Sequence, residues 1–232
     1  MLMRSRVPEL MDDPELDPKA HLEALRGLEA LNSVSRNTDL LWQELSTFFN
    51  RSEASPLRVL DLATGGGDTL IALDKRARRE KLAVEFVGAD ISPTAVEHAN
   101  KRARLENSRA KFISLNVLED ALPNGFDIVM TSLFTHHLDP PQVIELLKRM
   151  SGAAKEMVLV NDLVRSDLSL ALVWLATRLF SRSKIVHYDG PVSVRAAFTP
   201  DEMRSMGVKA GLGSCSVKRC PPCRQMLIWR AK

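Results

Sequence analysis

The 232-residue chain has few aromatic residues and little net charge. Aromatic side chains make up 5% of it, with a single tyrosine, and the formal net charge is +3. Binding of nucleic acid or of an anionic membrane requires concentrated positive charge, and unpaired bases also need aromatic side chains to stack on. We therefore expect no nucleic acid among its partners, and the charge does not favour an anionic membrane, although contact with a membrane surface stays a minor alternative.

The sequence also lacks a long apolar run. Its most apolar segment, residues 168–180, is shorter than the roughly 20 residues that a membrane span needs, and it contains Arg178. We interpret it as a buried or pocket-lining helix, so no stable membrane span is expected. The first eight residues include arginines but no apolar core of a secretory signal.

Cysteine is scarce, with Cys215, Cys220 and Cys223 as the only three. An odd number without a secretory signal indicates a reducing compartment, so we expect a cytoplasmic protein. Cys220 and Cys223 have a spacing seen in zinc sites, but a structural zinc site has four ligands and Cys215 supplies only a third. We expect a hairpin turn there and no metal.

Two kinds of pattern divide the chain. Residues 18–32 and 39–49 have the apolar spacing of amphipathic helices, which predicts an N-terminal helical cap over residues 1–56. This cap either covers a sheet edge or forms one wall of an acceptor pocket. From residue 57 to 232, short apolar runs alternate with helical segments, which is typical of an α/β domain with a doubly wound, Rossmann-like parallel sheet. Strands are predicted at 58–63, 84–90, 110–116, 127–132, 156–161, 214–219 and 225–229, and helices at 67–80, 93–105, 140–152, 166–182 and 200–210.

The last two predicted strands have no helix between them, so we expect an antiparallel hairpin at the end of a seven-stranded sheet. Ser92-Pro93 and Asp139-Pro140 each place a capping residue before a proline, which marks the start of a helix. In such a sheet, ligands bind at the carboxyl ends of the strands.

A glycine turn, Gly65-Gly66-Gly67, follows the first of these strands and precedes a helix. The turn has no Lys-Ser/Thr pair, so it is not a phosphate-binding P-loop. Asp90 ends the next strand, where an acid accepts hydrogen bonds from ribose hydroxyls. Asp61, inside the first strand, would repel a pyrophosphate but suits a ligand with sulfonium and ammonium groups. The pattern therefore favours S-adenosylmethionine over a nicotinamide dinucleotide.

These segments resemble the motifs of class I S-adenosylmethionine-dependent methyltransferases. Residues 59–67 look like the first motif, and residues 88–92, 116–123 and 126–132 look like the three that follow. Ala63 stands where the family usually has its first glycine. Asn116 replaces the usual aspartate, although its carbonyl oxygen can still accept a hydrogen bond from adenine.

The resemblance implies a role for each matching position. The backbone of Ala63, Gly65 and Gly67, with Thr64, would contact the methionine part, which Asp61 would orient. Asp90 would hold the ribose, with Ile91 beside it, and Asn116 and Val117 would contact the adenine. Ser132 and Leu133 would lie beside the sulfonium. The product of the cofactor would be S-adenosylhomocysteine, and residues 163–198 would form a lid insertion over the acceptor.

His136 and His137 directly follow the fourth strand, where the resemblance places the transferred methyl group. Histidine has the pKa range of a general base for a weakly acidic hydroxyl. Either histidine could act as the base or contact the acceptor, or both could be structural. The same alternatives apply to residues 187–190, which either line the pocket or form a plain loop. Asp139-Pro140-Pro141 is misplaced for the motif of amino-methylating enzymes, so base-amine methylation is not expected.

We predict an enzyme that methylates a small-molecule acceptor, at a phenolic or polyketide hydroxyl. Residues 17–28 and 161–165 look like bacterial methyltransferases associated with type III polyketide synthases. The alternatives are a quinone-type C-methyltransferase, a protein that binds the cofactor without turnover, and a nicotinamide oxidoreductase, which Asp61 disfavours. The sequence leaves open whether the chain is a monomer or a homodimer.

Overall fold

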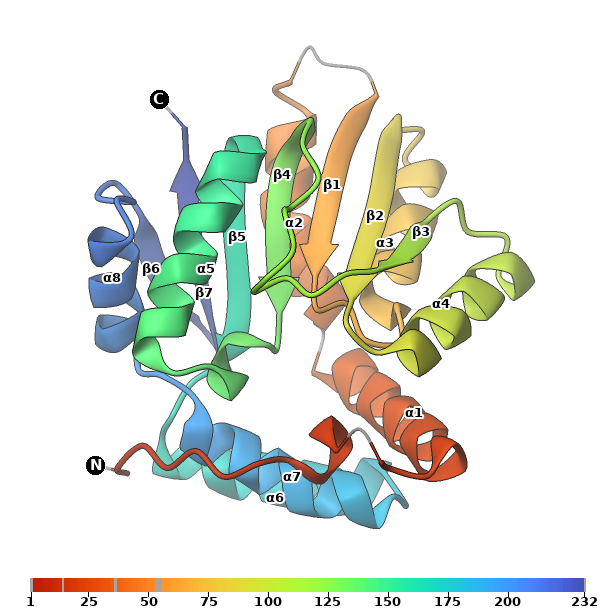
Figure 1. Ribbon diagram of the computed structural model, residues 1–232, viewed down its shortest axis with the longest axis vertical. Coiled ribbons are helices and arrows are strands. Elements are labelled where there is room, and N and C mark those ends of the chain that lie inside the picture. Colours follow the sequence, from red (N-terminus) through yellow and green to blue (C-terminus); the bar gives the residue numbers. More distant parts are fainter. Residues whose placement is uncertain (1, 14, 36, 53–55, 232) are drawn as a thin grey trace.

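A seven-stranded sheet forms the centre of the computed structural model, which describes residues 2–13, 15–35, 37–52 and 56–231 (Figure 1). The strand order is β3-β2-β1-β4-β5-β7-β6, and β7 runs in the direction opposite to that of the other six strands. The predicted fold, a doubly wound sheet with an antiparallel last strand, is confirmed. The strands are β1 (Leu57–Leu62), β2 (Val84–Asp90), β3 (Lys111–Ser114), β4 (Phe126–Ser132), β5 (Ala154–Leu163), β6 (Ser216–Cys220) and β7 (Arg224–Arg230).

Helices cover both faces of the sheet. The helices α2 (Asn37–Phe49), α3 (Asp68–Arg79) and α4 (Pro93–Leu105) pack on one face, and α5 (Pro140–Ala153) and α8 (Pro200–Lys209) on the other (Figure 1). Leu41 and Leu45 of α2 are fully buried in the same apolar cluster as residues of β1, β4 and β5. The second N-terminal helix is therefore part of the central core.

Both proline-marked helix starts are present as predicted. The hydroxyl of Ser92 accepts a hydrogen bond from the backbone N–H of Ala95 at 3.3 Å, and Pro93 begins α4. Pro140 begins α5, and Gln142 Oε1 accepts from the backbone N–H of Asp139 at 2.9 Å. These caps satisfy N–H groups that the first helical turn leaves without partners.

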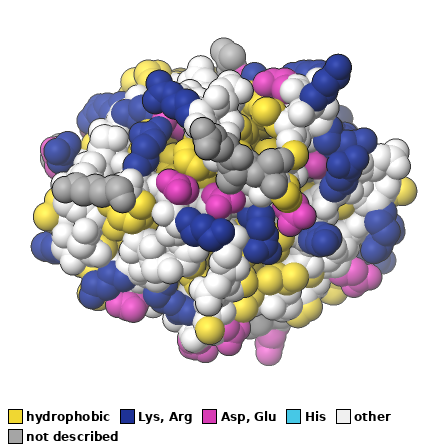
Figure 2. All heavy atoms as spheres, turned by 90° about the horizontal axis from the view of Figure 1, so that it is seen from above, with side chains coloured by type: hydrophobic (Ala, Val, Ile, Leu, Met, Phe, Trp, Pro, Cys, Tyr) yellow, Lys and Arg dark blue, Asp and Glu magenta, His cyan; other side chains and the backbone are white. Residues whose placement is uncertain are grey.

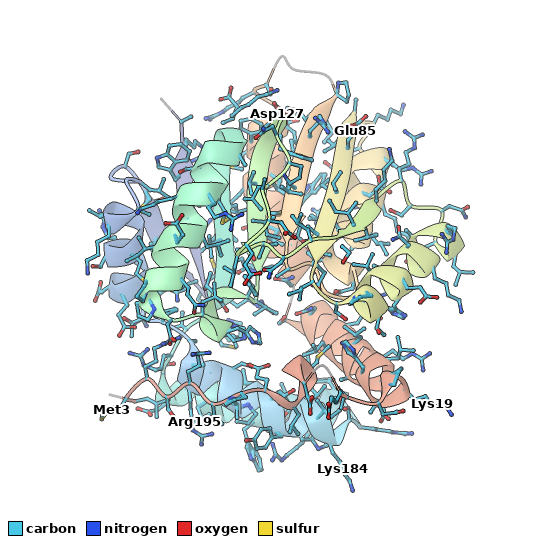
Figure 3. The ribbon with its side chains drawn as sticks, viewed as in Figure 1. Met3, Lys19, Glu85, Asp127, Lys184 and Arg195 are labelled. Atoms are coloured by element: carbon cyan, nitrogen blue, oxygen red, sulfur yellow. The ribbon has the colours of Figure 1, made fainter. Side chains whose placement is uncertain are left out.

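A third layer lies below the carboxyl ends of the parallel strands. It consists of α1 (Pro18–Val34), α6 (Asp167–Phe180) and α7 (Lys184–Ala196), with the N-terminal segment and the short 3-10 helix η1 (Leu10–Asp12) running beside α7 (Figure 1). Figure 3 places Met3 beside Arg195 and shows Lys19 and Lys184 in this layer, whereas Glu85 and Asp127 mark the opposite end of the sheet. A cavity at the carboxyl ends would therefore be enclosed by this layer.

Helix α7 was not predicted, because its sequence contains Gly190 and Pro191, which disfavour helix. Packing explains why it forms. A Cβ at Gly190 would lie 3.2 Å from Val173 of α6, and one at Gly27 of α1 would lie 3.0 Å from Val186 of α7. Glycine at these positions lets the three helices approach closely, and this tertiary contact outweighs the local preference.

Charged side chains of both signs mix at one end of the molecule. At the end of the sheet remote from the third layer, Lys and Arg side chains are interspersed with Asp and Glu (Figure 2). Within the described ranges, every helix is too short or too polar to span a bilayer.

We predict that Gly88→Ala in β2 lowers the free energy of unfolding by about 1–3 kcal/mol, because overpacking a filled core forces side chains to move. An added Cβ would lie 2.6 Å from the ring of Phe112 and 2.8 Å from Thr64 Cγ2. Gly152→Ala in α5 is the matched control, since its added Cβ meets nothing within 4 Å. Urea unfolding of the three proteins tests this, and equal midpoints for both variants would contradict it.

Candidate active site

The turn after β1 presents its backbone to a cavity. Ala63, Gly65 and Gly67 all have left-handed backbone angles, with φ of 56°, 56° and 74°. Their surroundings differ: a Cβ at Gly65 would meet nothing within 4 Å, whereas one at Gly67 would clash with the ring of Phe112 at 2.6 Å. Gly65 therefore leaves room for a ligand to approach the backbone, and Gly67 is required by packing beneath the turn.

Asp61 is a buried acid at the end of β1 that faces this cavity. Its Oδ2 accepts a hydrogen bond from Thr64 Oγ1 at 2.7 Å, but its Oδ1 is buried without a hydrogen-bond partner among the described residues. Burial, strengthened by the nearby acids Asp68 and Asp90 and opposed by Thr64, raises the pKa of Asp61 to about 7. A carboxylate in this state would gain most from a cationic ligand group.

A chain of buried polar side chains forms the cavity wall between α2 and the sheet. Asn37, the first residue of α2, donates to Thr69 Oγ1 of α3 at 3.0 Å. Its carbonyl oxygen accepts from Asn161 Nδ2 at 2.6 Å and from Ser132 Oγ at 3.3 Å. These bonds fix the start of α2 against the carboxyl ends of β4 and β5. Sequence reasoning gave neither Asn37 nor Asn161 a role in the site, because both depend on contacts between distant segments.

His136 lies in the 3-10 helix η2 (Thr135–His137) and is held by Asp162 near the end of β5. Asp162 Oδ1 is 2.7 Å from His136 Nδ1, and Asp162 Oδ2 accepts from the backbone N–H of His136 at 3.0 Å and from the hydroxyl of Thr135. Burial alone would lower the pKa of His136, but Asp162 and Glu9 outweigh it and raise this pKa to about 10. The other ring nitrogen, Nε2, points toward Glu9, which also lines the cavity.

The N-terminal segment brings Glu9 to this point. Asp189 of α7 accepts hydrogen bonds from the backbone N–H groups of Leu10 and Met11, at 2.8 and 3.1 Å. Glu9 Oε1 then lies 3.5 Å from His136 Nε2 and accepts from Ser193 Oγ at 2.5 Å. Residues 2–11, which we call the N-terminal strap, thus reach over η2 and place a carboxylate beside His136.

His137 is less buried than His136 and its ring lies 4.3 Å from that of His136 between centroids. Its Nε2 is 3.9 Å from Glu9 Oε2. Glu9, His136 and His137 each offer one ligand atom, and these atoms lie within 4.8 Å of one another, a set that could hold a divalent cation. The distance of 3.5 Å between Glu9 Oε1 and His136 Nε2 suits an ion pair between Glu9 and protonated His136.

One cavity of about 510 Å³, within the range of small-molecule sites, is lined by Glu9, Asn37, Asp61, His136 and His137. Its apolar walls come from Leu25 and Leu28 of α1 and from Leu172, Val173 and Ala176 of α6. Eight of the predicted site residues line it, namely Asp61, Ala63, Thr64, Gly65, Ser132, Leu133, His136 and His137. Sequence reasoning missed Glu9, Arg224 and the asparagine wall.

The other predicted positions are not among the residues that line this cavity. The carboxylate of Asp90 accepts from the backbone N–H groups of Gly65 at 2.7 Å and Ser92 at 2.9 Å, so it braces the glycine turn. Ile91 is largely exposed, and Asn116 Oδ1 accepts from the backbone N–H of Leu118 at 3.1 Å. Val117 is buried in the core beside α5. Gly67 packs on Phe112, as described above.

Comparison with known proteins identifies the reaction class. The family model described as a methyltransferase domain matches residues 59–157, from β1 to β5. The protein is an S-adenosylmethionine-dependent methyltransferase. Both the enzyme class and the cofactor expected from the glycine turn, Asp61 and Asp90 are thereby confirmed.

Relatives and solved structures agree with this class. A demethylmenaquinone methyltransferase from Thermus thermophilus is 26% identical over 192 residues, which cover 77% of this chain and 84% of the relative. One of the same name from Deinococcus radiodurans is 31% identical over 145 residues, 57% of this chain and 58% of the relative. The magnesium protoporphyrin IX methyltransferase of Synechocystis, solved with S-adenosylhomocysteine, has the same fold, with a TM-score of 0.62, 15% identity, and coverage of 88% and 86% of the two chains.

The cavity of the methyltransferase suits its cofactor chemically. Asp61 Oδ1, buried and without a hydrogen-bond partner among the described residues, matches the positive charge of a sulfonium or ammonium group. The open side of Gly65 allows the closest approach of a ligand to the turn. Both features lie on the cavity that also contains His136, so cofactor and acceptor can meet there.

We predict that the affinity of the methyltransferase for S-adenosylhomocysteine falls as pH decreases from 7.5 to 5.5. The pKa of Asp61 is about 7 in the free protein, so acidification neutralises a carboxylate that would attract the ammonium group. The decrease should approach tenfold per pH unit below this pKa. Calorimetric titration measures it, and Asp61→Asn should bind more weakly and independently of pH. An equally steep pH dependence in this variant would contradict the assignment.

We also predict that the unfolding free energy falls as pH rises from 7 to 10. The pKa of His136 is raised to about 10 from the ordinary histidine value of 6.5, so its stabilising contribution is complete below pH 6.5 and is lost as pH rises through 10. His136→Gln should show a shallower fall in urea unfolding. His187→Gln is the control, because His187 does not line the cavity and its Nε2 lies 2.8 Å from the carbonyl oxygen of Ser181. Parallel curves for all three proteins would refute the prediction.

Proposed function

We propose that the enzyme methylates a ring hydroxyl of a small, largely apolar phenolic or polyketide acceptor. The observation that carries this proposal is the pair of His136 and Asp162 in the same cavity as Asp61 and the glycine turn. The leucine and valine walls suit an apolar ring, and the histidine suits an acidic hydroxyl on it.

The cofactor, when bound, supplies an electrophilic methyl group, so the protein has to position the acceptor and manage its proton. Asp162 fixes His136 Nδ1, which leaves Nε2 as the atom that meets the acceptor. The acceptor hydroxyl takes the place of Glu9 at this nitrogen. With Glu9 beside it, His136 has a pKa of about 10 and is an imidazolium at neutral pH. This cation stabilises the acceptor as a phenolate, which binds after its hydroxyl proton has passed to solvent.

The predicted cofactor contacts form part of this proposal. Asp61, Ala63, Thr64 and Gly65 hold the methionine portion, and Ser132 and Leu133 flank the sulfonium. Asp90 and Ile91 lie toward the ribose, and Asn116 and Val117 toward the adenine, with Gly67 supporting the turn. Helices α1, α6 and α7 act as the lid over the acceptor, in agreement with their position below the carboxyl ends of the strands (Figure 1).

Methylation of a quinone-type ring at carbon is the second candidate function. Its support is the similarity to two demethylmenaquinone methyltransferases, one of them matched over 84% of its length. The same site would serve, because removal of a ring hydroxyl proton also activates the adjacent carbon.

We further propose a cytoplasmic location, in accord with the three free cysteines and the absence of a membrane-spanning helix within the described ranges.

Product analysis separates the two candidates. The enzyme is incubated with labelled S-adenosylmethionine and a panel of phenols, polyketide resorcinols and reduced quinones. O-methylation yields a product without the free hydroxyl, whereas C-methylation leaves the hydroxyl titratable. Transfer to none of these acceptors would contradict both proposals.

We predict that His136→Asn lowers kcat by about 100-fold or more, the usual cost of removing a group that stabilises an oxyanion at the reacting centre. His137→Asn should have a smaller effect, because its ring is not held by Asp162. Affinity for S-adenosylhomocysteine should change by less than about threefold in either variant. His187→Asn, outside the cavity, serves as the control. Undiminished turnover in the His136 variant would remove it from the mechanism.

A further inference from the structure

Arg224 is a buried guanidinium at the wall of the same cavity. It is the first residue of β7 and pairs with Leu163 at the end of β5, so it lies at the carboxyl edge of the parallel strands. Its side chain is only 5% exposed, and it lines the cavity. This places an arginine where ligands of this fold bind, although no sequence motif marks it.

The hydrogen bonds of Arg224 are incomplete. Its Nη2 donates to Ser35 Oγ at 2.8 Å and to Asn32 Oδ1 at 3.2 Å. Its Nε and Nη1 are buried and have no acceptor among the described residues. A guanidinium has five N–H donors and remains charged, so buried donors without partners are costly unless an acceptor binds there.

The nearest polar groups do not neutralise this charge directly. Asn32 stands between Arg224 and Asp68, because its Nδ2 donates to Asp68 Oδ2 at 3.2 Å while its oxygen accepts from Arg224. Asp162 has its own donors from Thr135, His136 and Leu163. Burial lowers the pKa of Arg224, the sign of a cation that the protein solvates poorly. An anionic ligand group would supply the missing acceptors.

We propose that Arg224, with Asn32 and Ser35 holding its guanidinium, forms a carboxylate-binding subsite in the cavity. The cofactor has a carboxylate on its methionine portion, and an acidic acceptor would bring another. The cofactor is the better match, because Asp61 Oδ1 is a second buried group without a partner in the same cavity and has the opposite charge. A carboxylate and a guanidinium that lack hydrogen-bond partners in the same cavity match the ammonium and carboxylate groups of an amino acid.

The test measures binding of the cofactor, so its outcome does not depend on the identity of the proposed acceptor. Affinities for S-adenosylmethionine and for decarboxylated S-adenosylmethionine, which lacks only the carboxylate, are compared in the wild type and in Arg224→Met. The wild type should favour the complete cofactor by about 10- to 100-fold, as expected for hydrogen bonds to a charged group. Arg224→Met should lose this preference and bind the decarboxylated form as the wild type does.

Two further arginine variants, Arg230→Met and Arg224→Lys, serve as controls. Arg230→Met removes an exposed arginine from the other end of β7 and should retain the preference. Arg224→Lys keeps the charge and should restore part of it if Arg224→Met folds poorly, as judged by thermal unfolding. An unchanged cofactor preference, together with a raised KM for carboxylated acceptors but not for their methyl esters, would assign the subsite to the acceptor. Unchanged binding of both kinds of carboxylate in Arg224→Met would overturn the proposal.

Discussion

The buried carboxylate of Asp162 is the group on which the geometry of the active site depends. It accepts hydrogen bonds from the hydroxyl of Thr135 and the backbone N–H groups of His136 and Leu163, and it contacts the His136 ring at 2.7 Å. A buried carboxylate is tolerated only with such a set of donors, and here the donors are the turn after β4 itself. Burial alone would raise the pKa of Asp162, but His136 and these donors outweigh it and keep this pKa low. One side chain near the end of β5 therefore fixes the turn, the orientation of the histidine ring and the direction of Nε2.

Two charged side chains that line the cavity have buried atoms without hydrogen-bond partners in the described part of the chain. Asp61 Oδ1 and the Nε and Nη1 of Arg224 are buried without partners among the described residues. The side chains of Asn37, Thr69, Ser132 and Asn161 bond to one another, although Asn161 Oδ1 also has no hydrogen-bond partner within the described ranges. Buried polar groups that lack hydrogen bonds lower the stability of a folded chain. Such groups are concentrated at sites where a bound ligand supplies the missing hydrogen bonds. The cavity thus combines a rigid polar wall with two groups of opposite sign that a bound ligand can satisfy.

The sequence predicted the sheet because strand and helix periods alternate regularly from residue 57 onward, and the glycine turn with Asp61 marked the cofactor end. These signals are local, and the structure places Asp61, Gly65 and His136 on one cavity as expected. Helix α7 escaped prediction, because its Gly190-Pro191 pair opposes helix locally and only packing against α6 and α1 selects it. Glu9 and Arg224 escaped for a related reason. Each reaches the site from an end of the chain, and no spacing within the sequence connects either one with residues 61–67 or 136.

The N-terminal strap places the carboxylate of Glu9 beside Nε2 of His136 on the cavity wall. Arg6 pairs with Asp139 in an exposed position, at 2.7 Å between Nη2 and Oδ2, whereas Arg4 donates to the carbonyl oxygens of Ala196 and Leu138 at 2.7 Å each. Surface ion pairs contribute little to stability, so the strap depends chiefly on the partly buried bonds of Arg4 and on Asp189. In the proposed mechanism, an acceptor that reaches His136 Nε2 displaces Glu9, while Asp162 stays at Nδ1. An ionised hydroxyl would replace the negative charge of Glu9 at Nε2, whereas a neutral acceptor would not, so this contact would favour acidic acceptors.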